Sequence, residues 1–351
     1  MANIVAEGLS KVFGPDPRSV VPLLEEGVGK DEILERTGHT VGLQDVDLAI
    51  EDGETFVVMG LSGSGKSTLV RCFNRLIEPT SGTLTLDGVD VLALGRRELR
   101  ELRRRRMGMV FQRFALLPHR NVLDNVGFGL RVQGVARAER ERRAGAWIER
   151  VGLQGYERSL PRELSGGMQQ RVGLARALCT DPDVLLMDEA FSALDPLIRR
   201  EMQGELLRLQ RELAKTIVFI THDLDEALRL GDRVAVLKDG IVVQVGTPTE
   251  IVTRPADAYV EAFVEDVDRS RVLKVRHVMT PVGQGDAGIG ASERDGSAVR
   301  VSSQALLQDV VAEVAAAPET VLAVDGEGRI VGRLEMRAVL AALARAQQGT
   351  P

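Results

Sequence analysis

The chain has 351 residues, of which 44% are hydrophobic and 27% charged, and its formal net charge is −6. This composition is typical of a globular protein long enough for two domains, and the mild acidity argues against a nucleic-acid-binding protein, which usually presents a basic surface. No stretch approaches the roughly 20 apolar residues of a membrane-spanning helix and no secretory signal opens the chain, so we expect a soluble, intracellular protein.

The N-terminal part of the pattern predicts strands around a glycine-rich turn. Residues 1–13 and 41–50 predict strands, and the amphipathic segment 22–36 between them predicts a short inserted helix. The apolar run 55–59 predicts a buried strand that stops at the turn, and 67–76 then has a helical pattern. Together these last segments form a strand–loop–helix unit.

Further along, residues 97–160 have a mainly helical pattern. Short apolar runs then return between helical stretches, as a parallel α/β sheet requires. These runs predict strands at 184–187, 217–220, 234–237 and 241–245, the last two joined by a hairpin turn at Lys238–Gly240.

A phosphate-binding loop follows the first buried strand, because the segment from Gly60 to Ser67 fits the pattern GxxxxGK[ST]. Backbone N–H groups of such a loop wrap a polyphosphate, and the helix that follows adds its positive N-terminus. Lys66 would reach the β- and γ-phosphates of ATP, and the Ser67 hydroxyl would hold Mg²⁺. The nucleotide-binding residues predicted here are Gly60, Ser62, Gly63, Ser64, Gly65, Lys66, Ser67 and Thr68.

Two adjacent carboxylates, Asp188 and Glu189, end the apolar run 184–187. Asp188 is predicted to bind Mg²⁺ through water, and Glu189 to polarise the water that attacks the phosphate. By itself, an apolar run that ends in Asp-Glu is also compatible with an ordinary buried strand. Its position after a phosphate-binding loop favours the catalytic interpretation.

The segment Leu164–Gln170 (LSGGMQQ) resembles the LSGGQ-like signature of the ABC ATPase family, with Met168 where the family more often has glutamine. A serine hydroxyl and glycine N–H groups at a helix start suit a γ-phosphate, which indicates Ser165, Gly166 and Gly167 as nucleotide-binding residues.

The same resemblance implies roles for residues elsewhere in the chain. Gln112 stands at the Q-loop position, as a catalytic residue and a Mg²⁺ ligand, and Asp195 ends the D-loop Ser192–Asp195. His222 stands at the position of the switch histidine. Phe13 matches the aromatic residue that stacks on adenine, with a place in the hydrophobic core as the alternative.

Residues 1–267 are similar to the ATPase subunit of glycine betaine/proline betaine (quaternary amine) importers. The similarity is carried by the inserted segment Val21–Thr37 and by the stretches MGLSGSGKSTLVRCFNRLIEPTSG and MDEAFSALDPLIRREMQ. It implies an α/β fold, that of the ABC-type P-loop NTPase core, with a helical subdomain at about 97–175. Another small-solute importer remains the alternative.

The partners implied by the resemblance are a second copy of the chain, an integral-membrane permease and an extracytoplasmic substrate-binding protein. Each ATP would lie between the phosphate-binding loop of one subunit and Ser165 of the other. A groove near Gln112 and the segment Arg113–Asn121 would move the permease, at the cytoplasmic face of the inner membrane. No nucleic-acid partner is expected.

The tail, residues 268–351, resembles a small α+β CBS-type regulatory module that begins Val275–Pro281. Its pattern predicts a loop at 281–297, strands at 320–324 and 330–334, and a final helix. The tail is too short for two full repeats. Where such a repeat usually holds an adenosine ribose, Gly332–Ala338 lacks both the hydroxyl and the final acid. We therefore expect weak or no nucleotide binding, and any salt response from the basic cluster Arg269, Arg271, Lys274 and Arg276.

Two alternatives of other classes remain. An ABC protein that acts on nucleic acid or ribosomes would carry coiled-coil insertions, two ATPase cores or iron–sulfur cysteines, and none is visible; Cys72 and Cys179 are far apart and predict buried free thiols. A purely regulatory module with an inactive ATPase would need the loss of Lys66, Asp188 or Glu189, and all three are present.

Overall fold

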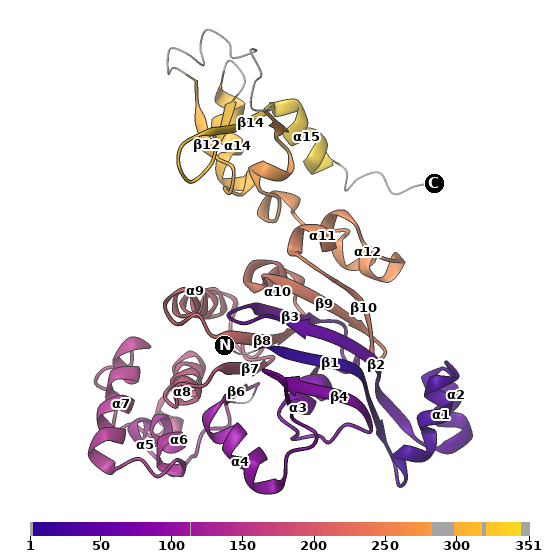
Figure 1. Cartoon of the computed structure of the whole chain (residues 1–351). Coiled ribbons are helices and arrows are strands. Elements are labelled where there is room, and N and C mark those ends of the chain that lie inside the picture. Colours follow the sequence, from indigo (N-terminus) through magenta and orange to yellow (C-terminus); the bar gives the residue numbers. More distant parts are fainter. Residues whose placement is uncertain (1–2, 113, 283–297, 318–320, 345–351) are drawn as a thin grey trace. The chain divides into compact units, whose positions relative to one another are not determined.

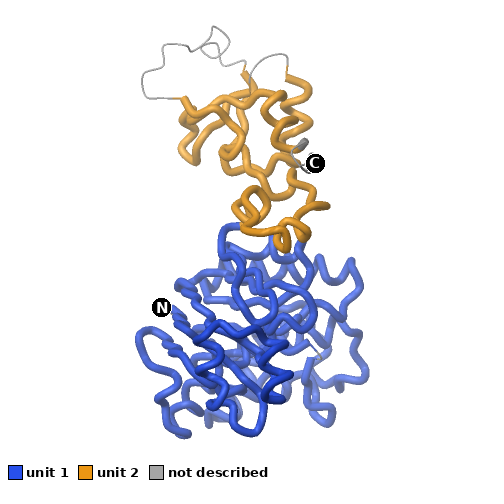
Figure 2. Tube along the Cα trace, turned by 90° about the vertical axis from the view of Figure 1, so that its right-hand side faces the viewer, with its two compact units in different colours: residues 1–247 blue, residues 248–351 orange. Residues whose placement is uncertain are grey.

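The structure is a computed structural model that describes residues 3–112, 114–282, 298–317 and 321–344 (Figure 1). The chain divides into two compact units, residues 1–247 and 248–351 (Figure 2). The sequence placed the domain boundary at 267/268, twenty residues later. The hydrophobic core of the second unit contains no residue before Leu273, so the assignment of 248–267 to the ATPase domain stays a prediction.

The first unit is built on a six-stranded sheet with the strand order β10-β9-β3-β8-β7-β6. Neighbouring strands from β9 to β6 run parallel, and β10 adds to the edge as an antiparallel hairpin with β9. Every residue of β3, β7 and β8 is buried, as expected for parallel strands covered on both faces. The strands are β3 (Thr55–Met59), β6 (Met107–Phe111), β7 (Val184–Asp188), β8 (Thr216–Thr221), β9 (Arg233–Lys238) and β10 (Ile241–Gly246).

Strand β6 corrects the sequence prediction, because it lies inside the segment 97–160 that the pattern indicated as mainly helical. Only five residues long, it follows helix α4 (Arg96–Arg105) and pairs in parallel with β7. Its partner is far along the chain, so local periodicity does not reveal it. The pairing brings Phe111 opposite Asp188, and the residue that follows, Gln112, therefore lies at the edge of the sheet where β7 ends.

A second sheet, antiparallel, has the order β2-β1-β4-β5. Its residues share one hydrophobic core with the central sheet and with helix α3 (Lys66–Phe73). This core includes the fully buried side chains of Phe56 from β3 and Phe73 from α3. This core packs α3 against both sheets and so fixes the loop that precedes the helix. The strands are β1 (Ile4–Phe13), β2 (Thr40–Ile50), β4 (Ser81–Leu86) and β5 (Val89–Asp90).

The inserted segment between β1 and β2 forms short helices instead of the single helix predicted at 22–36. The break falls after α1, where Gly27 adopts a left-handed φ of 76°. Val12, Val20, Ile33 and Val41 bury this segment in a small apolar cluster of its own. The elements are the 3-10 turn η1 (Pro17–Val20), α1 (Val21–Glu25) and α2 (Lys30–Thr37).

Four helices form a subdomain whose separate core runs from Val122 to Cys179. The predicted bounds 97–175 start earlier, where Leu102 of α4 and Met107 of β6 belong to the core of the sheets. The four helices are α5 (Val122–Val126), α6 (Phe128–Val132), α7 (Arg137–Arg150) and α8 (Gly166–Leu178), with the 3-10 turn η2 (Pro161–Glu163) before α8. Helices α9 (Pro196–Leu213) and α10 (Leu224–Leu230) follow β7 and β8 and complete the unit (Figure 1).

The second unit is a small α+β module, whose sheet has the order β11-β14-β13-β12. Strands β12 and β13 are parallel and α14 connects them, while β13 and β14 form an antiparallel hairpin at the two predicted strand positions. Most of the loop predicted at 281–297 lies outside the described residues. The elements are α11 (Pro248–Thr253), α12 (Ala258–Val264), the 3-10 turns η3 (Arg269–Arg271) and η4 (Val275–His277), β11 (Thr280–Pro281), β12 (Arg300–Ser302), α14 (Leu307–Ala316), β13 (Val321–Val324), β14 (Ile330–Leu334) and α15 (Met336–Ala344).

Among the helices that the structure describes, none combines the length and the apolar character needed to cross a membrane.

Candidate active site

The candidate site lies where four parallel strands end. The phosphate-binding loop Gly60–Gly65 follows β3, and Gln112 follows β6. Asp188 ends β7 and Glu189 follows it, and His222 follows β8. Carboxyl ends of neighbouring parallel strands meet at one edge of a sheet, which is where open α/β sheets bind ligands. The fold therefore gathers residues from four distant parts of the chain.

The phosphate-binding loop depends on glycines for space as well as for conformation. Gly60 has a φ of 153°, and a Cβ atom there would lie 2.2 Å from the carbonyl oxygen of Leu237. Gly65 has a φ of 101°, and a Cβ atom there would lie 2.6 Å from the carbonyl oxygen of Gly42. Side chains at either position would push the loop away from β2 and β9, so its path requires glycine.

A hairpin turn supports the loop from the side. Asp239 and Gly240 both have positive φ, 53° and 86°, as a type I′ turn requires, which confirms the predicted turn at Lys238–Gly240. Gly240 N donates to Ser64 O at 3.0 Å, and Gln44 N donates to Gly240 O at 2.9 Å. Asp239 also pairs with Lys30, which opens helix α2 of the inserted segment.

Lys66, in the first turn of α3, is buried and points back into the loop. Its Nζ donates to Gly60 O at 2.9 Å and to Leu61 O at 2.8 Å. Burial lowers the pKa of Lys66, and the carboxylates of Glu189 and Asp188 act in the opposite direction. The ammonium group therefore binds the loop and lies within electrostatic reach of the two carboxylates. The sequence expects the β- and γ-phosphates beside this group. Ser62 and Gly63 lie exposed at the tip of the loop, whereas Ser64 is buried and Thr68 is half-buried.

Asp188 is buried, and both of its oxygens are occupied by α3. Ser67 Oγ donates to Oδ1 at 2.7 Å, and Arg71 donates to Oδ2 from Nη2 at 3.0 Å and from Nε at 3.2 Å. A carboxylate and a hydroxyl side by side are oxygen donors of the kind that Mg²⁺ prefers. The donor set therefore fits the predicted metal, and Arg71 is a contact that the sequence reasoning missed.

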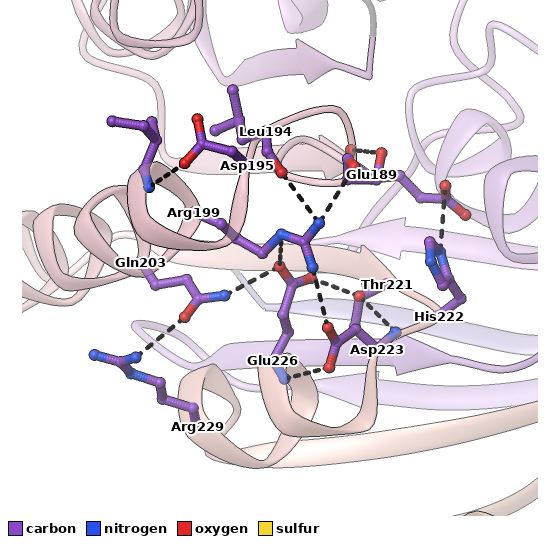
Figure 3. A network of polar contacts seen from close by, with 12 residues as sticks. Glu189, Leu194, Asp195, Arg199, Gln203, Thr221, His222, Asp223, Glu226 and Arg229 are labelled. Carbon is purple, nitrogen blue, oxygen red and sulfur yellow. Dashed lines mark hydrogen bonds and ion pairs between the residues drawn. The ribbon is translucent and has the colours of Figure 1, made fainter. Parts of the chain in front are cut away.

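Glu189 is the meeting point of the three predicted catalytic residues. Gln112 Nε2 lies 3.2 Å from Glu189 Oε2 and 3.3 Å from Ser192 Oγ, and His222 Nδ1 lies 3.6 Å from Glu189 Oε2. Figure 3 shows the contact between His222 and Glu189. Glu189 also has a left-handed φ of 47°, which typically costs about 1–2 kcal/mol outside glycine. Such strain is concentrated at functional sites, where the surrounding structure fixes it.

Phe13 does not belong to the hydrophobic core, because its side chain is 40% exposed at the end of β1. Its ring lies against Gly42, where a Cβ atom would come within 2.7 Å of it, and Gly42 in turn touches Gly65. Lys11 Nζ lies 4.9 Å from the ring centroid. The exposed ring next to the phosphate-binding loop excludes the core alternative.

The signature segment opens helix α8. Ser165 and Gly166 are exposed, and Ser165 Oγ caps the helix by accepting from Met168 N at 3.3 Å. Gly167 must be small, because a Cβ atom there would lie 2.6 Å from Ile198 of α9. Met168 packs on the core of the helical subdomain, so its side chain serves α8 packing.

Asp195, the last residue of the D-loop, is exposed and caps α9 by accepting from Ile198 N at 3.0 Å. In the part of the chain that the structure describes, no hydrogen bond or ion pair joins Ser165 or Asp195 to the Glu189 cluster. Within one chain these two predicted nucleotide-binding residues are presented outwards at helix starts.

A half-buried arginine of α8 holds the segment that follows Gln112. Arg176 donates to Ala115 O at 2.7 Å and to Phe114 O at 3.0 Å, and burial lowers its pKa. Phe114 and Ala115 both have left-handed φ values, 52° and 47°. Residue 113, which the sequence placed in the permease-contacting groove, lies outside the described residues. No sequence motif indicated that Arg176 would hold this strained segment.

Comparisons with known proteins agree with these motifs. The ABC transporter family matches residues 43–192. The glycine betaine transport ATP-binding protein OpuAA of Bacillus subtilis is 58% identical over 277 residues, which are 79% of this chain and 66% of that protein. The trimethylamine N-oxide transport system ATP-binding protein TmoW of Ruegeria pomeroyi is 48% identical over 343 residues, which are 98% of this chain and 97% of that protein.

The solved structures include a dimeric, post-hydrolysis state of the ATP-binding cassette MJ0796 bound to ADP and Pi. It superposes on this chain with a TM-score of 0.60 at 31% identity, and the match covers 70% of this chain and 98% of that one.

Proposed function

The chain belongs to the ABC transporter family as one of its ATP-binding subunits, and from this premise we propose that it hydrolyses ATP to drive import of a small methylated amine through a separate permease. The observation that carries the proposal is the meeting of Gln112, Glu189 and His222 beside Lys66, at the edge of the sheet where the phosphate-binding loop lies. Glycine betaine is the cargo that we propose first.

In the proposed reaction, the phosphates of ATP lie in the loop Gly60–Gly65 and its adenine stacks on the exposed ring of Phe13. Lys66 leaves the carbonyls of Gly60 and Leu61 and turns its ammonium to the β- and γ-phosphates. Glu189 takes the proton of the attacking water, as a positioned general base. His222, which faces the same carboxylate, holds the γ-phosphate in line.

Mg²⁺ would be held by Ser67 and Gln112 directly and by Asp188 through water. When bound, this ion neutralises the charge that develops on the phosphate oxygens. The hydrogen bond from Ser67 to Asp188 already places both oxygen donors on one side of the loop. Arg71 donates to the other oxygen of Asp188 and so orients that carboxylate.

We propose that two copies of the chain form the working unit, with Ser165, Gly166 and Asp195 of one copy completing the site of the other. The exposure of these residues supports the proposal, since they are presented outwards in a single chain. The cassette of the solved post-hydrolysis structure is itself described as dimeric. The pair would bind a permease at the cytoplasmic face of the membrane, with an extracytoplasmic substrate-binding protein opposite.

The cargo has a second candidate, trimethylamine N-oxide. The relative named for it matches 98% of this chain, including the tail, whereas the match to the relative named for glycine betaine covers 79%. The higher identity favours glycine betaine, at 58% over 277 residues against 48% over 343 residues. Both molecules carry methyl groups on a positively charged nitrogen, so we define the class as small methylated amines.

A transport experiment separates the two candidates. The full chain is reconstituted in liposomes with the permease and binding protein encoded beside its gene, and ATP-driven uptake of labelled glycine betaine and trimethylamine N-oxide is measured. We expect glycine betaine to accumulate, and the Glu189→Gln chain to carry nothing. Uptake of trimethylamine N-oxide alone would make it the cargo in place of glycine betaine. Uptake of neither molecule would contradict import of methylated amines.

The tail, residues 268–351, is proposed to be a CBS-like regulator outside the ATPase. Its separate core, from Leu273 to Val339, supports this, because the core includes no residue of the predicted site. At the position expected for a ribose contact, Glu335 directly follows β14 and precedes α15, without the hydroxyl and acid of a nucleotide-binding repeat. Regulation by a nucleotide is therefore not part of the proposal.

A further inference from the structure

Arg199, on helix α9, joins two segments that lie beside the candidate site (Figure 3). Its Nη2 donates to Leu194 O at 3.2 Å and to Ser192 O at 3.4 Å, both in the D-loop. Its Nη1 donates to Asp223 Oδ2 at 3.3 Å, on the segment that carries His222. One guanidinium group thus holds the backbone of the D-loop and the residue after the histidine together.

The buried carboxylate of Glu226, on α10, forms an ion pair with this guanidinium group. Glu226 is only 4% exposed, and Thr221 Oγ1 donates to its Oε2 at 2.6 Å while Gln203 Nε2 donates to its Oε1 at 3.0 Å. Burial raises the pKa of Glu226, and the positive charge of Arg199 acts in the opposite direction. Arg199 Nε is buried and has no hydrogen-bond partner among the described residues, and it lies 3.9 Å from Glu226 Oε1. A small movement of either segment would convert this ion pair into a direct hydrogen bond.

These contacts close a ring around Glu189. Gln112 reaches both Glu189 and Ser192, and Ser192 Oγ donates to Glu189 O at 2.9 Å. Arg199 donates to both Ser192 O and Asp223 Oδ2 and so connects these two segments. His222, next to Asp223 in the chain, contacts Glu189 and completes the ring. Among the described residues of this ring, Arg199 is the only charged group that donates hydrogen bonds to the D-loop backbone.

We propose that Arg199 is a positioning residue, which makes the D-loop and the segment of His222 move as one body during ATP hydrolysis. The inference rests on the proposed function, in which the D-loop faces a second subunit. A displacement of Ser192–Asp195 by that subunit then reaches His222 through the guanidinium group. Arg199 acts through His222 and Glu189 and does not touch the nucleotide itself.

The test compares steady-state ATP hydrolysis by the full chain carrying Arg199→Met or Arg199→Lys. Methionine keeps the apolar stem and removes the charge, whereas lysine keeps the charge but cannot span both carbonyls and Asp223. Misplacement of a catalytic group by about 1 Å costs about 10²-fold in rate. We expect kcat to fall about 10- to 100-fold in both variants, with the KM for ATP unchanged within about twofold, because the lost interaction serves the transition state.

The matched control is Arg229→Met. Arg229 Nη1 donates to Gln203 Oε1 at 3.3 Å, so it belongs to the same polar network at the far side from the D-loop (Figure 3). We expect near-native kcat in this control, and comparable melting temperatures for all variants. The double variant Arg199→Met/Glu226→Gln should lose no more activity than the stronger single variant, since both changes break one connection.

The outcomes are distinguishable. If the unaltered chain hydrolyses no ATP, the proposed function is wrong and Arg199 is irrelevant to it. If the unaltered chain is active and Arg199→Met keeps its kcat, the positioning role is overturned. The role is equally overturned if Arg229→Met loses as much activity as Arg199→Met, or if Arg199→Lys restores native kcat, because charge alone would then be sufficient.

Discussion

Ser67 Oγ donates a 2.7 Å hydrogen bond to Asp188 Oδ1, which joins the first turn of α3 to the end of β7. Both oxygens are predicted to serve Mg²⁺, so we expect Ser67→Ala to raise the Mg²⁺ concentration that gives half-maximal ATP hydrolysis by about tenfold, in line with the loss of one ligand-shell interaction. The measurement is phosphate release across a Mg²⁺ series. Thr83→Ala, which removes an exposed hydroxyl of β4, is the control and should leave the titration unchanged. An unshifted curve for Ser67→Ala would remove Ser67 from the metal site.

Glu189→Gln should nearly abolish hydrolysis while leaving ATP binding intact. The amide keeps the size of the side chain and its contact with Gln112, but it cannot accept the proton of the attacking water. Removal of a general base typically costs about 10²–10⁴-fold in rate. Phosphate release gives the rate, and equilibrium binding of labelled ATP gives the affinity. Turnover near the native rate would show that another group is the base.

The shared site predicts complementation between two inactive chains. A heterodimer of Lys66→Ala and Ser165→Arg chains has one doubly damaged site and one intact site, so ATP hydrolysis should reappear on mixing. A heterodimer of Lys66→Ala and Glu189→Gln chains has one defect in each site and should stay inactive. The two mixtures are compared at equal, confirmed heterodimer content. Equal activity in both would mean that Ser165 does not act across the dimer.

Both cysteines should be inert in the native chain. Cys72 and Cys179 are free and buried, and burial raises the pKa of each thiol to about 12 from 9.0. The thiolate is the reactive form, so a disulfide reagent at pH 8 should label neither residue before unfolding and both in denaturant. As pH rises, the thiols lose their protons at a lower pH in the unfolded chain than in the folded chain. Burial of the neutral thiols therefore favours folding below about pH 9, and this contribution to stability is lost as pH rises towards 12. Rapid labelling of the native chain would contradict the buried positions.

Truncation tests the domain boundary. A chain that ends at Asp268 should keep its ATPase activity and its melting transition, because the core of the second unit begins at Leu273. A chain that ends at Thr247, where the compact unit ends, also lacks α11 and α12. If these helices belong to the ATPase domain as the sequence predicted, only the shorter chain should lose stability. Equal behaviour of both truncations would place them with the tail. If the chain that ends at Asp268 lost its ATPase activity, the tail would be needed for ATP hydrolysis.

Local patterns sufficed for the parts of the fold that are local. The glycine loop, the strands at 55–59 and 184–187 and the hairpin at Lys238–Gly240 each have a signal within a few residues, and the structure has all of them. Strand β6 was missed because its stability comes from pairing with β7, and its five residues carry too little periodicity. The inserted helix was predicted as one because Gly27 was not recognised as a break.

The supporting arginines could not be predicted for a related reason. Arg71, Arg176 and Arg199 lie on helices but outside every motif that the sequence offers. Their partners are carboxylates or backbone carbonyls of other segments, which the fold brings beside these helices. A motif records residues that touch the ligand and leaves out those that hold them. The contact of the Phe13 ring with Gly42, likewise, joins two neighbouring strands and has no local signal in the sequence.

The strand order has a consequence for how the chain is made. Strand β3, which carries the phosphate-binding loop, pairs with β8 on one side and with β9 on the other, and both follow the family-matched segment 43–192. During synthesis on the ribosome, β3 therefore emerges before either of its neighbouring strands. It stays unpaired while about 170 more residues are synthesised, which takes roughly 10–35 s at ordinary translation rates. During this interval its apolar residues need protection, and slowing translation late in the message should increase aggregation of the nascent chain. A fragment limited to 43–192 would never acquire these neighbours, so the shortest segment able to form the loop extends past Gly240.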